Sequence, residues 1–453
     1  MIEAIKRLFA IEDLKKKILF TLLMLAVCRV GAMIPVPGIN ADMALMLFKQ
    51  ATGGGQNLFQ LMDIFSGGAF AHMTVIALGV MPYISASIIM QLLVALIPSF
   101  QRDMKENPEM GKRKMGKWTR IMTVGLALFQ SGIFARYAIN LNESHPGIVV
   151  GQLASSHIFG VPLLFYLTVM LTMTTGTAFL MWVGEQISEK GIGNGVSLII
   201  TIGIISSLPG TIGSIIGQLN LDSQEPGQLT FSSMVVLCSL FVLIVIGTIL
   251  ISQGQRKIPL QYARRVVGRR EVQGGSSYIP LKITYAGVIP VIFASSFLMF
   301  PATIGQLIGQ GNWLGRLAAM LSPGSWVYTA VYAIMILLLT YFWTATQFNP
   351  EQIASDMKRN GAFIPGIRQG KSTQEYLEAA MNRLTLVGGI FLAIIAVLPT
   401  LISRLMNIDP RISYFFGGTS LLILVGVILD TSKQIESHLL MKRYDGFMKR
   451  KGR

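Results

Sequence analysis

Charged residues are scarce in this sequence. Asp, Glu, Lys and Arg make up 13% of the 453 residues, about half of the ~25% that is usual in a soluble domain. Hydrophobic residues account for 52%. That is enough for ten membrane spans of about 20 apolar residues each, with few apolar residues left for a core outside the membrane. The composition nearly excludes a water-soluble globule and predicts a protein that lies mostly in a membrane.

Cysteine and histidine are also rare, with two and four copies. Cys28 and Cys238 each lie inside an apolar run, without a second Cys or His at ligand spacing, so neither a disulfide framework nor a zinc site is indicated. The histidines are dispersed, and no zinc-protease motif, nucleophile elbow or Walker A loop occurs. The sequence therefore predicts no metal, no cofactor and no catalytic site.

Carboxylates are nearly missing from the apolar runs, since Asp63, Glu185 and Asp430 lie beside run ends or in a short segment. Ion-coupled carriers place acidic groups near mid-bilayer, and a membrane-embedded enzyme needs paired His or carboxylates within its spans. Both rival classes, a secondary transporter for small solutes and a membrane enzyme, are therefore disfavoured. The GIGNG sequence at 191–195 lacks the preceding strand and following Lys of a phosphate loop, and we expect a tight turn there.

Ten apolar runs are long enough to cross a bilayer. They occupy residues 18–37, 73–97, 121–138, 158–183, 192–216, 231–251, 283–304, 326–346, 384–402 and 414–429. The fifth is interrupted by Ser206, Ser207, Pro209 and Gly210, which a membrane helix tolerates when neighbouring groups satisfy its backbone. The predicted fold class is an all-α polytopic membrane protein with ten transmembrane helices.

The Lys and Arg residues of the connections predict the orientation. If the N-terminus is cytoplasmic, 32 of the 38 Lys and Arg residues lie on that side, so both termini are expected in the cytoplasm. Residues 1–17 then form an amphipathic N-terminal segment, 18–217 hold helices 1–5, 218–432 hold helices 6–10, and 433–453 form a basic tail. Five spans in each half permit an inverted repeat, because a second five-helix unit must enter from the opposite face.

Two cytoplasmic connections, 252–282 and 347–383, exceed the ~12–15 residues beyond which a loop usually has a function. Both are basic and rich in turn residues. In the first, apolar and basic residues alternate in GQRKIPLQYARRVVGRR, which predicts a protruding hairpin or arm. The second has a basic tip with two Gly-flanked turns. The alternative is that these polybasic segments merely rest on anionic lipid.

A short, half-apolar segment at 57–71, NLFQLMDIFSGGAFA, is too short to cross the bilayer. It is interpreted as a re-entrant or interfacial piece, and its Gly67-Gly68 pair would let the chain bend. A re-entrant piece is allowed only where it is buried in protein or lines a cavity. The alternative is an amphipathic helix on the membrane surface.

Several motifs together resemble one family. They are IPVPGI at 34–39, FSGGAF and ALGVMPYISASIIMQLL within 65–93, GEQISEKGIGNG at 184–195, AGVIPVIFASS at 286–296, FNPEQIA at 348–354, GAFIPGIRQG at 361–370, RLTLVGG at 383–389 and YFFGGTSLLI at 414–423. In this order they resemble the SecY/Sec61-alpha family, whose bacterial members form the central subunit of the Sec protein translocase. The resemblance covers nearly the whole chain.

The resemblance implies an hourglass between two pseudo-symmetric, inverted five-helix halves, closed at its waist by a ring of apolar side chains. Carried over by motif, the pore ring consists of Val80, Ile84, Ile200, Ile292 and Ile423. A narrow apolar constriction resists wetting and so blocks ions, while side chains on separate helices can part around a polypeptide. Val80 is smaller than the Ile common at that place in the family, which implies a slightly wider ring.

The resemblance also implies roles for the short segment, as a plug, and for several helices, as a lateral gate. Residues 57–71 would be the plug beneath the ring, formed by Phe59, Leu61, Met62, Ile64, Phe65, Ser66, Gly67 and Gly68. Helices 2 and 3 against helices 7 and 8 would form a lateral gate, with Gln91, Gln130 and Thr284 as its polar contacts. An Asn is frequent near the last position in relatives, so Thr284 departs from the pattern there.

The two basic loops would dock the ribosome and the motor ATPase SecA. The positions carried over are Arg256, Lys257, Arg269, Arg270 and Arg368, since basic side chains can neutralise RNA phosphates or meet acidic protein surface. Lys257 replaces the Arg often seen after GQR, which keeps the charge but loses bidentate pairing. The implied protein is a conduit and not an enzyme. It lies in the bacterial inner membrane with SecE and SecG as small partners, passing signal-bearing polypeptides outward and transmembrane segments into the lipid bilayer.

Overall fold

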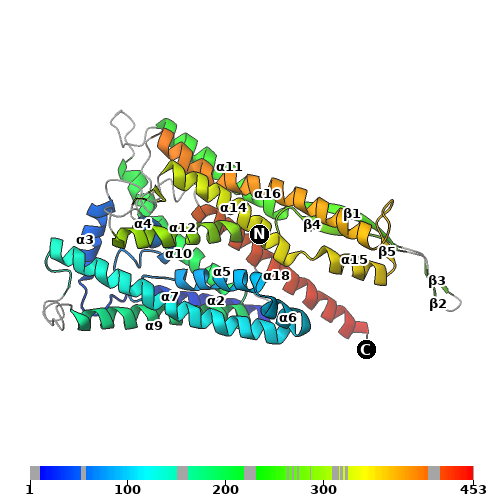
Figure 1. The fold of residues 1–453 in the computed structure, drawn as a ribbon, viewed down its shortest axis with the longest axis horizontal. Coiled ribbons are helices and arrows are strands. Elements are labelled where there is room, and N and C mark those ends of the chain that lie inside the picture. Colours follow the sequence, from blue (N-terminus) through cyan, green and yellow to red (C-terminus); the bar gives the residue numbers. More distant parts are fainter. Residues whose placement is uncertain are drawn as a thin grey trace.

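The computed structural model describes residues 11–52, 58–149, 162–218, 231–262, 265–267, 270–272, 275–285, 287–308, 316, 320–321, 325–406 and 419–451. This part of the chain is mostly helical, and the long helices lie side by side along the long axis of the molecule (Figure 1). A small β-structure extends from one end (Figure 1).

The first part of the chain forms one group of helices. Its long members are α2 (Glu12–Gly31), α5 (Met81–Leu96), α7 (Pro108–Ser144), α9 (Leu163–Lys190) and α10 (Gly195–Gln218), and the shorter α3 (Ala41–Thr52), α4 (Leu58–Ser66) and α6 (Pro98–Glu106) connect them. Helix α9 lies at the centre of this group, packing against α2, α5, α7 and α10. The short α4 packs against α10.

The second part forms another group. It contains α11 (Phe231–Gln253), α12 (Ile289–Ile308), α14 (Trp326–Gln347), α15 (Pro350–Arg359), α16 (Lys371–Leu405) and α18 (Thr419–Lys451). Helix α14 packs against α12 and α16, and α11 packs against α16 and α18. The two groups meet where α12 contacts α5 and where α18 contacts α10.

Each of the ten predicted apolar runs overlaps a helix, namely α2, α5, α7, α9, α10, α11, α12, α14, α16 or α18. Within the described residues, six helices are long and apolar enough to cross a membrane, or seven if α5 and the α6 residues bent by 94° from it form one span. The second run was predicted to begin at residue 73, whereas α5 begins at Met81. Residues before it turn through positive φ at Met73 and Gly79, and Pro82 at the first turn favours a helix start there.

The first long connection is a hairpin, as the alternating pattern predicts. Strands β1 (Gln255–Tyr262) and β4 (Ser276–Lys282) pair antiparallel from Gln255↔Lys282 to Gln261↔Ser276. The second connection adds β5 (Ala362–Phe363) to the other edge of β1. Beyond them, β2 (Arg265–Val267) pairs with β3 (Arg270–Val272). The two loops that the sequence separates by a pair of spans therefore share one sheet.

Buried apolar side chains form three clusters. The first core draws on α2, α4, α5, α7, α9 and α10, the second on α11, α12, α14, α16 and α18, and the third joins both long loops. Helices α12 and α18 contribute to the first two through neighbouring residues. Ile292 and Ile423 belong to the first core, whereas Val291 and Leu422 belong to the second. These two helices are therefore the boundary between the helix groups.

Candidate functional site: the buried waist and the segment that covers it

The five predicted ring residues share one apolar cluster. Their exposed fractions are 4% for Val80 and Ile84, 2% for Ile200, 6% for Ile292 and 0% for Ile423, and all five belong to the first core. Val80 precedes the first residue of α5, and the others lie on α5, α10, α12 and α18. Four separate helices thus contribute side chains to a single apolar cluster.

The cluster crosses the boundary between the two helix groups. Ile292 and Ile423 come from helices whose other faces pack in the second core. Beside them, the Ser296 hydroxyl of α12 lies 3.7 Å from the Met81 sulfur, while the Ile292 carbonyl at 2.9 Å is a closer acceptor for its one proton. Neither Met81 nor Ser296 carries a charge, so this contact between α5 and α12 can separate without leaving a buried charge unpaired.

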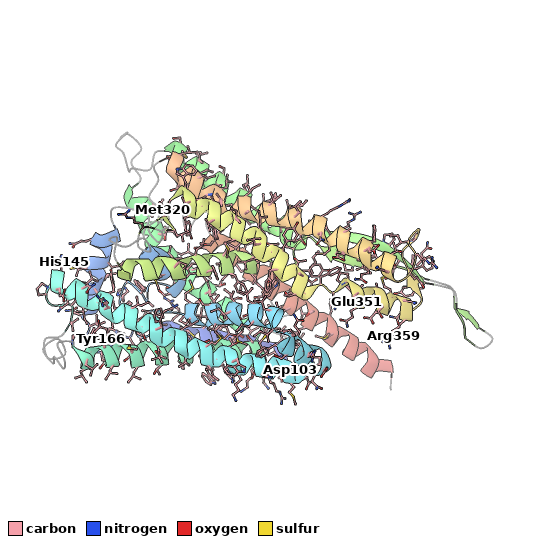
Figure 2. All side chains as sticks on the ribbon, viewed as in Figure 1. Asp103, His145, Tyr166, Met320, Glu351 and Arg359 are labelled. Atoms are coloured by element: carbon pink, nitrogen blue, oxygen red, sulfur yellow. The ribbon has the colours of Figure 1, made fainter. Side chains whose placement is uncertain are left out.

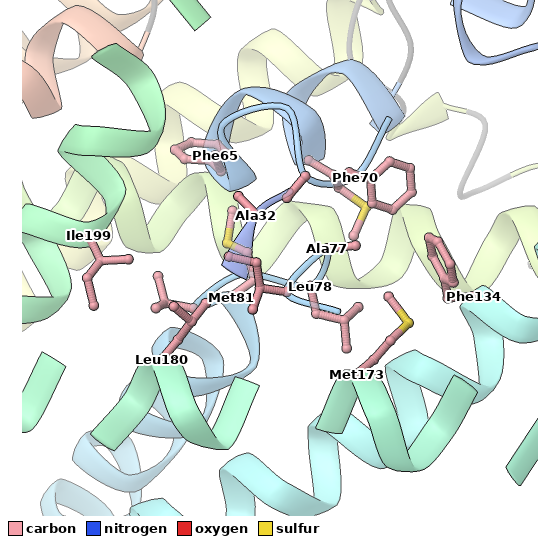
Figure 3. Close-up of a cluster of buried hydrophobic side chains, with 14 of the residues drawn as sticks. Ala32, Phe65, Phe70, Ala77, Leu78, Met81, Phe134, Met173, Leu180 and Ile199 are labelled. Carbon is pink, nitrogen blue, oxygen red and sulfur yellow. The ribbon is translucent and has the colours of Figure 1, made fainter. Parts of the chain in front are cut away.

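The short helix α4 lies on this cluster. Met62 and Phe65 have exposed fractions of 9% and 7% and belong to the first core, while Ile64 packs against it half-buried. Figure 3 shows Phe65 at the edge of the cluster that includes Met81, Leu180 and Ile199. Phe59 and Leu61 lie on α4, but their side chains fall outside the described residues. Burial of Met62 and Phe65 by protein argues against a helix that merely rests on the membrane surface.

The chain after α4 is fastened to α4 itself. The Asp63 carboxylate accepts the Ala71 N–H at 2.8 Å, and the Ser66 hydroxyl accepts the Phe70 N–H at 3.0 Å. Gly67 and Gly68 have φ of 68° and 88°, a left-handed backbone that glycine adopts without strain. The predicted bend at this pair is confirmed. We call residues 58–71 the closing segment, because helix and turn are joined into one body.

Apolar and backbone contacts anchor the far end of the closing segment. The Phe70 ring meets Phe134 of α7 edge-on, with 5.3 Å between ring centroids (Figure 3). The following residues pair with the IPVPGI motif, since Val36 donates to the Met73 carbonyl at 3.0 Å and Val75 donates to the Ile34 carbonyl at 2.9 Å. The motif after α2 therefore acts as a fixed support for the chain that leads from the closing segment into α5.

One cation contacts the turn that follows α4 in the closing segment. The Nη2 of Arg29 on α2 donates to the Gly67 carbonyl at 2.8 Å and to the Ser206 hydroxyl of α10. Arg29, Ser66 and Val80 also line a cavity of about 20 Å³, which is room for about one water. In the sequence, Arg29 is a charge inside the first apolar run. An arginine in an apolar run is itself a signal of function.

The three predicted gate residues lie on separate elements. Gln91 is half-buried on α5, with its side-chain nitrogen donating to Ser87 at 3.2 Å, and Gln130 is half-buried on α7. Thr284 is buried just before α12 and lies against Gly388 of α16, where a Cβ would come within 2.7 Å of the Thr284 methyl. Both glutamine Oε1 atoms and the Thr284 hydroxyl are buried without a hydrogen-bond partner among the described residues.

Three of the five predicted docking residues lie on the shared sheet or in a turn before α16. Arg256 and Lys257 are exposed at the start of β1, and the Lys257 ammonium lies 4.8 Å from the centroid of the Tyr278 ring. Arg368 is exposed in the turn before α16. Arg270 is on β3, with its side chain outside the described part, and Arg269 lies outside the described residues altogether. Ile258 and Ile367, which neighbour these residues in the sequence, both pack in the third core, and we call the exposed Arg256, Lys257 and Arg368 beside that core the platform.

The GIGNG sequence is a tight turn whose amides are already occupied. Gly193 donates to the Gln434 side chain at 2.9 Å, and Gly195 donates to the Ser188 hydroxyl at 2.9 Å. Ile192 donates to the Thr21 hydroxyl of α2 at 3.1 Å. The predicted turn is confirmed. These three amides face protein acceptors instead of a phosphate and link the α9–α10 turn to α2 and α18.

Metal-binding side chains do not gather in the described part of the chain, where no three His, Cys, Asp or Glu residues are placed to hold an ion. Two ion pairs lie at the end of the bundle near α6. They join Arg120 of α7 to Glu185 of α9 at 2.8 Å and Lys114 to Asp103 at 2.6 Å. The cluster around the five ring positions is instead mainly apolar, and the polar side chains described beside it include the buried Ser66 and Ser296 and the half-buried Arg29.

Known proteins resemble this chain along almost all of its length. The SecY family model matches residues 74–432. The protein translocase subunit SecY of Chlamydia trachomatis serovar D is 60% identical over 447 residues, which cover 98% of each chain. A solved structure described as that of a protein conducting channel aligns with a TM-score of 0.61 and 21% identity, over 93% of this chain and 92% of its own. Sec61 in the canine ribosome-channel complex from the endoplasmic reticulum gives 0.58 and 17%, with the same coverage.

The family match extends from the turn before α5 into α18 and so includes every predicted ring position. The identity to a translocase subunit is far above the level at which only a fold is shared. The resemblance inferred from the motifs is confirmed, and the chain belongs to the SecY family, the channel subunit of the protein translocase.

Proposed function

We propose that this chain is a ten-span channel of the bacterial inner membrane that passes unfolded secretory polypeptides outward and releases transmembrane segments sideways into lipid. The observation that carries the proposal is the single apolar cluster that gathers Val80, Ile84, Ile200, Ile292 and Ile423 from both helix groups and includes the closing segment. A cluster at such a boundary can open when the groups move apart.

The ring closes by excluding water. A constriction lined only by aliphatic side chains has no group to replace the hydration shell of an ion, so ions do not enter while it is narrow. A polypeptide in transit would part the same side chains and fill the gap with its own atoms. No chemical step is required of the channel, and we infer that the driving energy comes from a partner.

The closing segment is the plug in this proposal, and the α5–α12 contact is the lateral gate. Burial of Met62 and Phe65 on the ring cluster supports the first assignment. The second is supported by the weak contact between Ser296 and Met81. An apolar signal sequence would enter between α5 and α12, and the unpartnered oxygens of Gln91 and Gln130 would offer it hydrogen bonds.

Ten spans with both termini in the cytoplasm fit the distribution of charge. Helix α2 begins with charged residues and α18 ends with them, so neither is apolar throughout, while α12 is interrupted by Pro301. We assign these three and α5 as spans with the six apolar helices, in two inverted five-helix halves. Figure 2 shows Asp103, Glu351 and Arg359 at one end of the molecule and His145 and Tyr166 at the other. The first end is assigned to the cytoplasm.

The platform of Arg256, Lys257 and Arg368 is the proposed docking surface for the ribosome and for SecA. These side chains are exposed and form no ion pair with another described residue, which leaves their charge free for phosphate or carboxylate groups. The structural neighbour in the canine ribosome-channel complex supports the ribosome as one such partner. SecE and SecG are the proposed small membrane subunits, and they complete the complex used in the experiment below.

The experiment is reconstitution of the purified complex into vesicles with the motor ATPase and a signal-bearing precursor. The precursor should become protease-protected only when ATP is supplied, and a precursor with a charged residue in its signal should stay outside. Protection without ATP, or no protection despite a folded complex with all partners present, would contradict the proposed function.

A further inference from the structure

Arg29 is a cation on an apolar helix, and its hydrogen bonds join two other elements. One terminal nitrogen carries two hydrogens, so Nη2 can donate to the Gly67 carbonyl and to the Ser206 hydroxyl at the same time. Gly67 belongs to the closing segment and Ser206 to α10. Arg29 itself is half-buried, and neither of these two acceptors is a carboxylate. Placing a charged side chain in a membrane-spanning helix costs free energy, so such a residue indicates a function.

The closing segment approaches α10 backbone to backbone at this point. A Cβ added at Gly67 would lie 2.6 Å from the Gly203 Cα, and one added at Gly203 would lie 3.0 Å from the Phe65 carbonyl oxygen. No side chain fits between the two chains, so an apolar pair cannot seal them here. The hydrogen bonds of Arg29 therefore link the closing segment to α10 at a point where no side chain fits between the two chains.

We propose that Arg29 is the positioning residue that holds the closing segment against α10 and thereby keeps the waist covered in the resting channel. This inference rests on the proposed function of the closing segment as the plug. Just after Gly67, the C-terminal end of the segment is fixed separately, by Phe70 on Phe134 and by the pairing of residues 73–75 with 34–36. Release of the Arg29 bonds would let α4 swing about that fixed end.

The size of the effect follows from the type of bond. Hydrogen bonds from a charged donor favour the bonded state by on the order of tenfold to hundredfold each, and partial exposure of Arg29 moves the expectation toward the lower figure. Two such bonds suffice to keep a small segment in place most of the time, yet an entering polypeptide that competes for the same space can break them. The attachment is thus strong enough to seal and weak enough to release.

The fixed charge itself offers a different explanation, because a cation beside a pore repels other cations. The Arg29→Lys variant distinguishes the hydrogen-bond explanation from the charge explanation. Arg29→Lys keeps the charge, but its ammonium stands one bond nearer the backbone than Nη2 and falls short of the two acceptors. Arg29→Met removes both charge and donor, and Ser206→Ala removes one acceptor at an exposed position. Arg136→Met, at an exposed arginine of α7, is the matched control.

The test uses the full complex in vesicles and has two readouts, ion leak and labelling of a cysteine placed at Ile64 of α4 by a membrane-impermeant thiol reagent from the outer side. Labelling is measured above that of the parent, because Cys28 is buried but Cys238 is exposed. We expect Arg29→Met and Arg29→Lys to raise both leak and labelling by about a hundredfold, because each variant loses two hydrogen bonds that are worth about tenfold each. Ser206→Ala should raise them less, and Arg136→Met should leave them unchanged.

Two results would overturn the attachment. One is a sealed Arg29→Lys channel beside a leaking Arg29→Met channel whose Ile64 cysteine stays protected, which would make Arg29 a charge barrier. The other is unchanged labelling in Ser206→Ala, a variant that keeps the protein folded even if Arg29→Met fails to insert. Deletion of residues 61–71 distinguishes a failure of this inference from a failure of the plug assignment. If the deletion leaks while the Arg29 and Ser206 variants do not, the plug stands and the attachment fails; if the deletion does not leak, the plug assignment fails.

Discussion

Burial alone does not distinguish a ring residue from an ordinary core residue. Ile292 is 6% exposed in the first core, and Ile244 of α11 is 0% exposed in the second. Both would lose apolar contacts on truncation, and both would leave an unsatisfied group if replaced by Asn, at a cost of about 1–3 kcal/mol. The proposal that Ile292 is a barrier residue rests on its position, where helices of the two groups meet.

The ring assignment predicts that Ile84→Asn or Ile292→Asn raises the ion leak of reconstituted vesicles while translocation survives. If a polar group lowers the barrier to ion entry by about 1.4 kcal/mol, the leak rises about tenfold. The same variants should accept defective signal sequences, because a loosened waist makes the open state easier to reach. Ile244→Asn is the matched control and should destabilise the protein without increasing leak. Equal leak in parent and variants at all five ring positions would remove the assignment.

Charge at Arg368 is expected to act on binding and not on folding. The side chain is exposed in the turn before α16, and such surface substitutions usually change stability by less than ~0.5 kcal/mol. Arg368→Glu should therefore insert and melt like the parent, yet lose most ATPase-driven transport or ribosome binding. Molar salt should weaken the parent complex in a similar way, since screening then falls to a few Å. Normal binding of Arg368→Glu at low salt would make the basic loops lipid anchors only.

Among the elements, the closing segment is the one whose removal should leave the fold intact. Its own hydrogen bonds run mostly within residues 58–71, through Asp63 and Ser66. Deletion of residues 61–71 should give an inserted protein that leaks ions and accepts defective signals. A second measurement follows a cysteine at Phe65, which should be protected from an outside thiol reagent until a substrate engages. Constant labelling of that cysteine would indicate an interfacial helix instead.

Elements defined by local pattern were predictable from the sequence, whereas their contacts were not. Alternation in 255–262 predicts a strand, but nothing local indicates that β5, about a hundred residues later, pairs with its edge. Arg29 was visible as a charge in a span, yet its acceptors lie 38 and 177 residues away. Gln91, Gln130 and Thr284 came from the family resemblance, and the sequence could not show that Thr284 lies against Gly388. Such contacts depend on tertiary packing, which no local pattern records.

At the scale of the whole molecule, two apolar cores are joined through α12 and α18. Each of these helices places one face in each core, so separating the helix groups would break contacts of α12 with α5 while leaving the second core intact. This division explains how a membrane protein with so few charges can open. The groups are held by apolar packing, which a transiting chain can replace with its own apolar and backbone atoms.

The central claim is that the polypeptide passes through the ring. A precursor arrested in transit, with a single cysteine in the arrested stretch, should form disulfides with cysteines placed singly at Val80, Ile84, Ile200, Ile292 and Ile423. It should not react with a cysteine at Leu243, which is 54% exposed on α11. Cross-linking at all five ring positions and not at Leu243 is the predicted result. Reaction at Leu243 with none at the ring would place the path outside the waist and contradict the account.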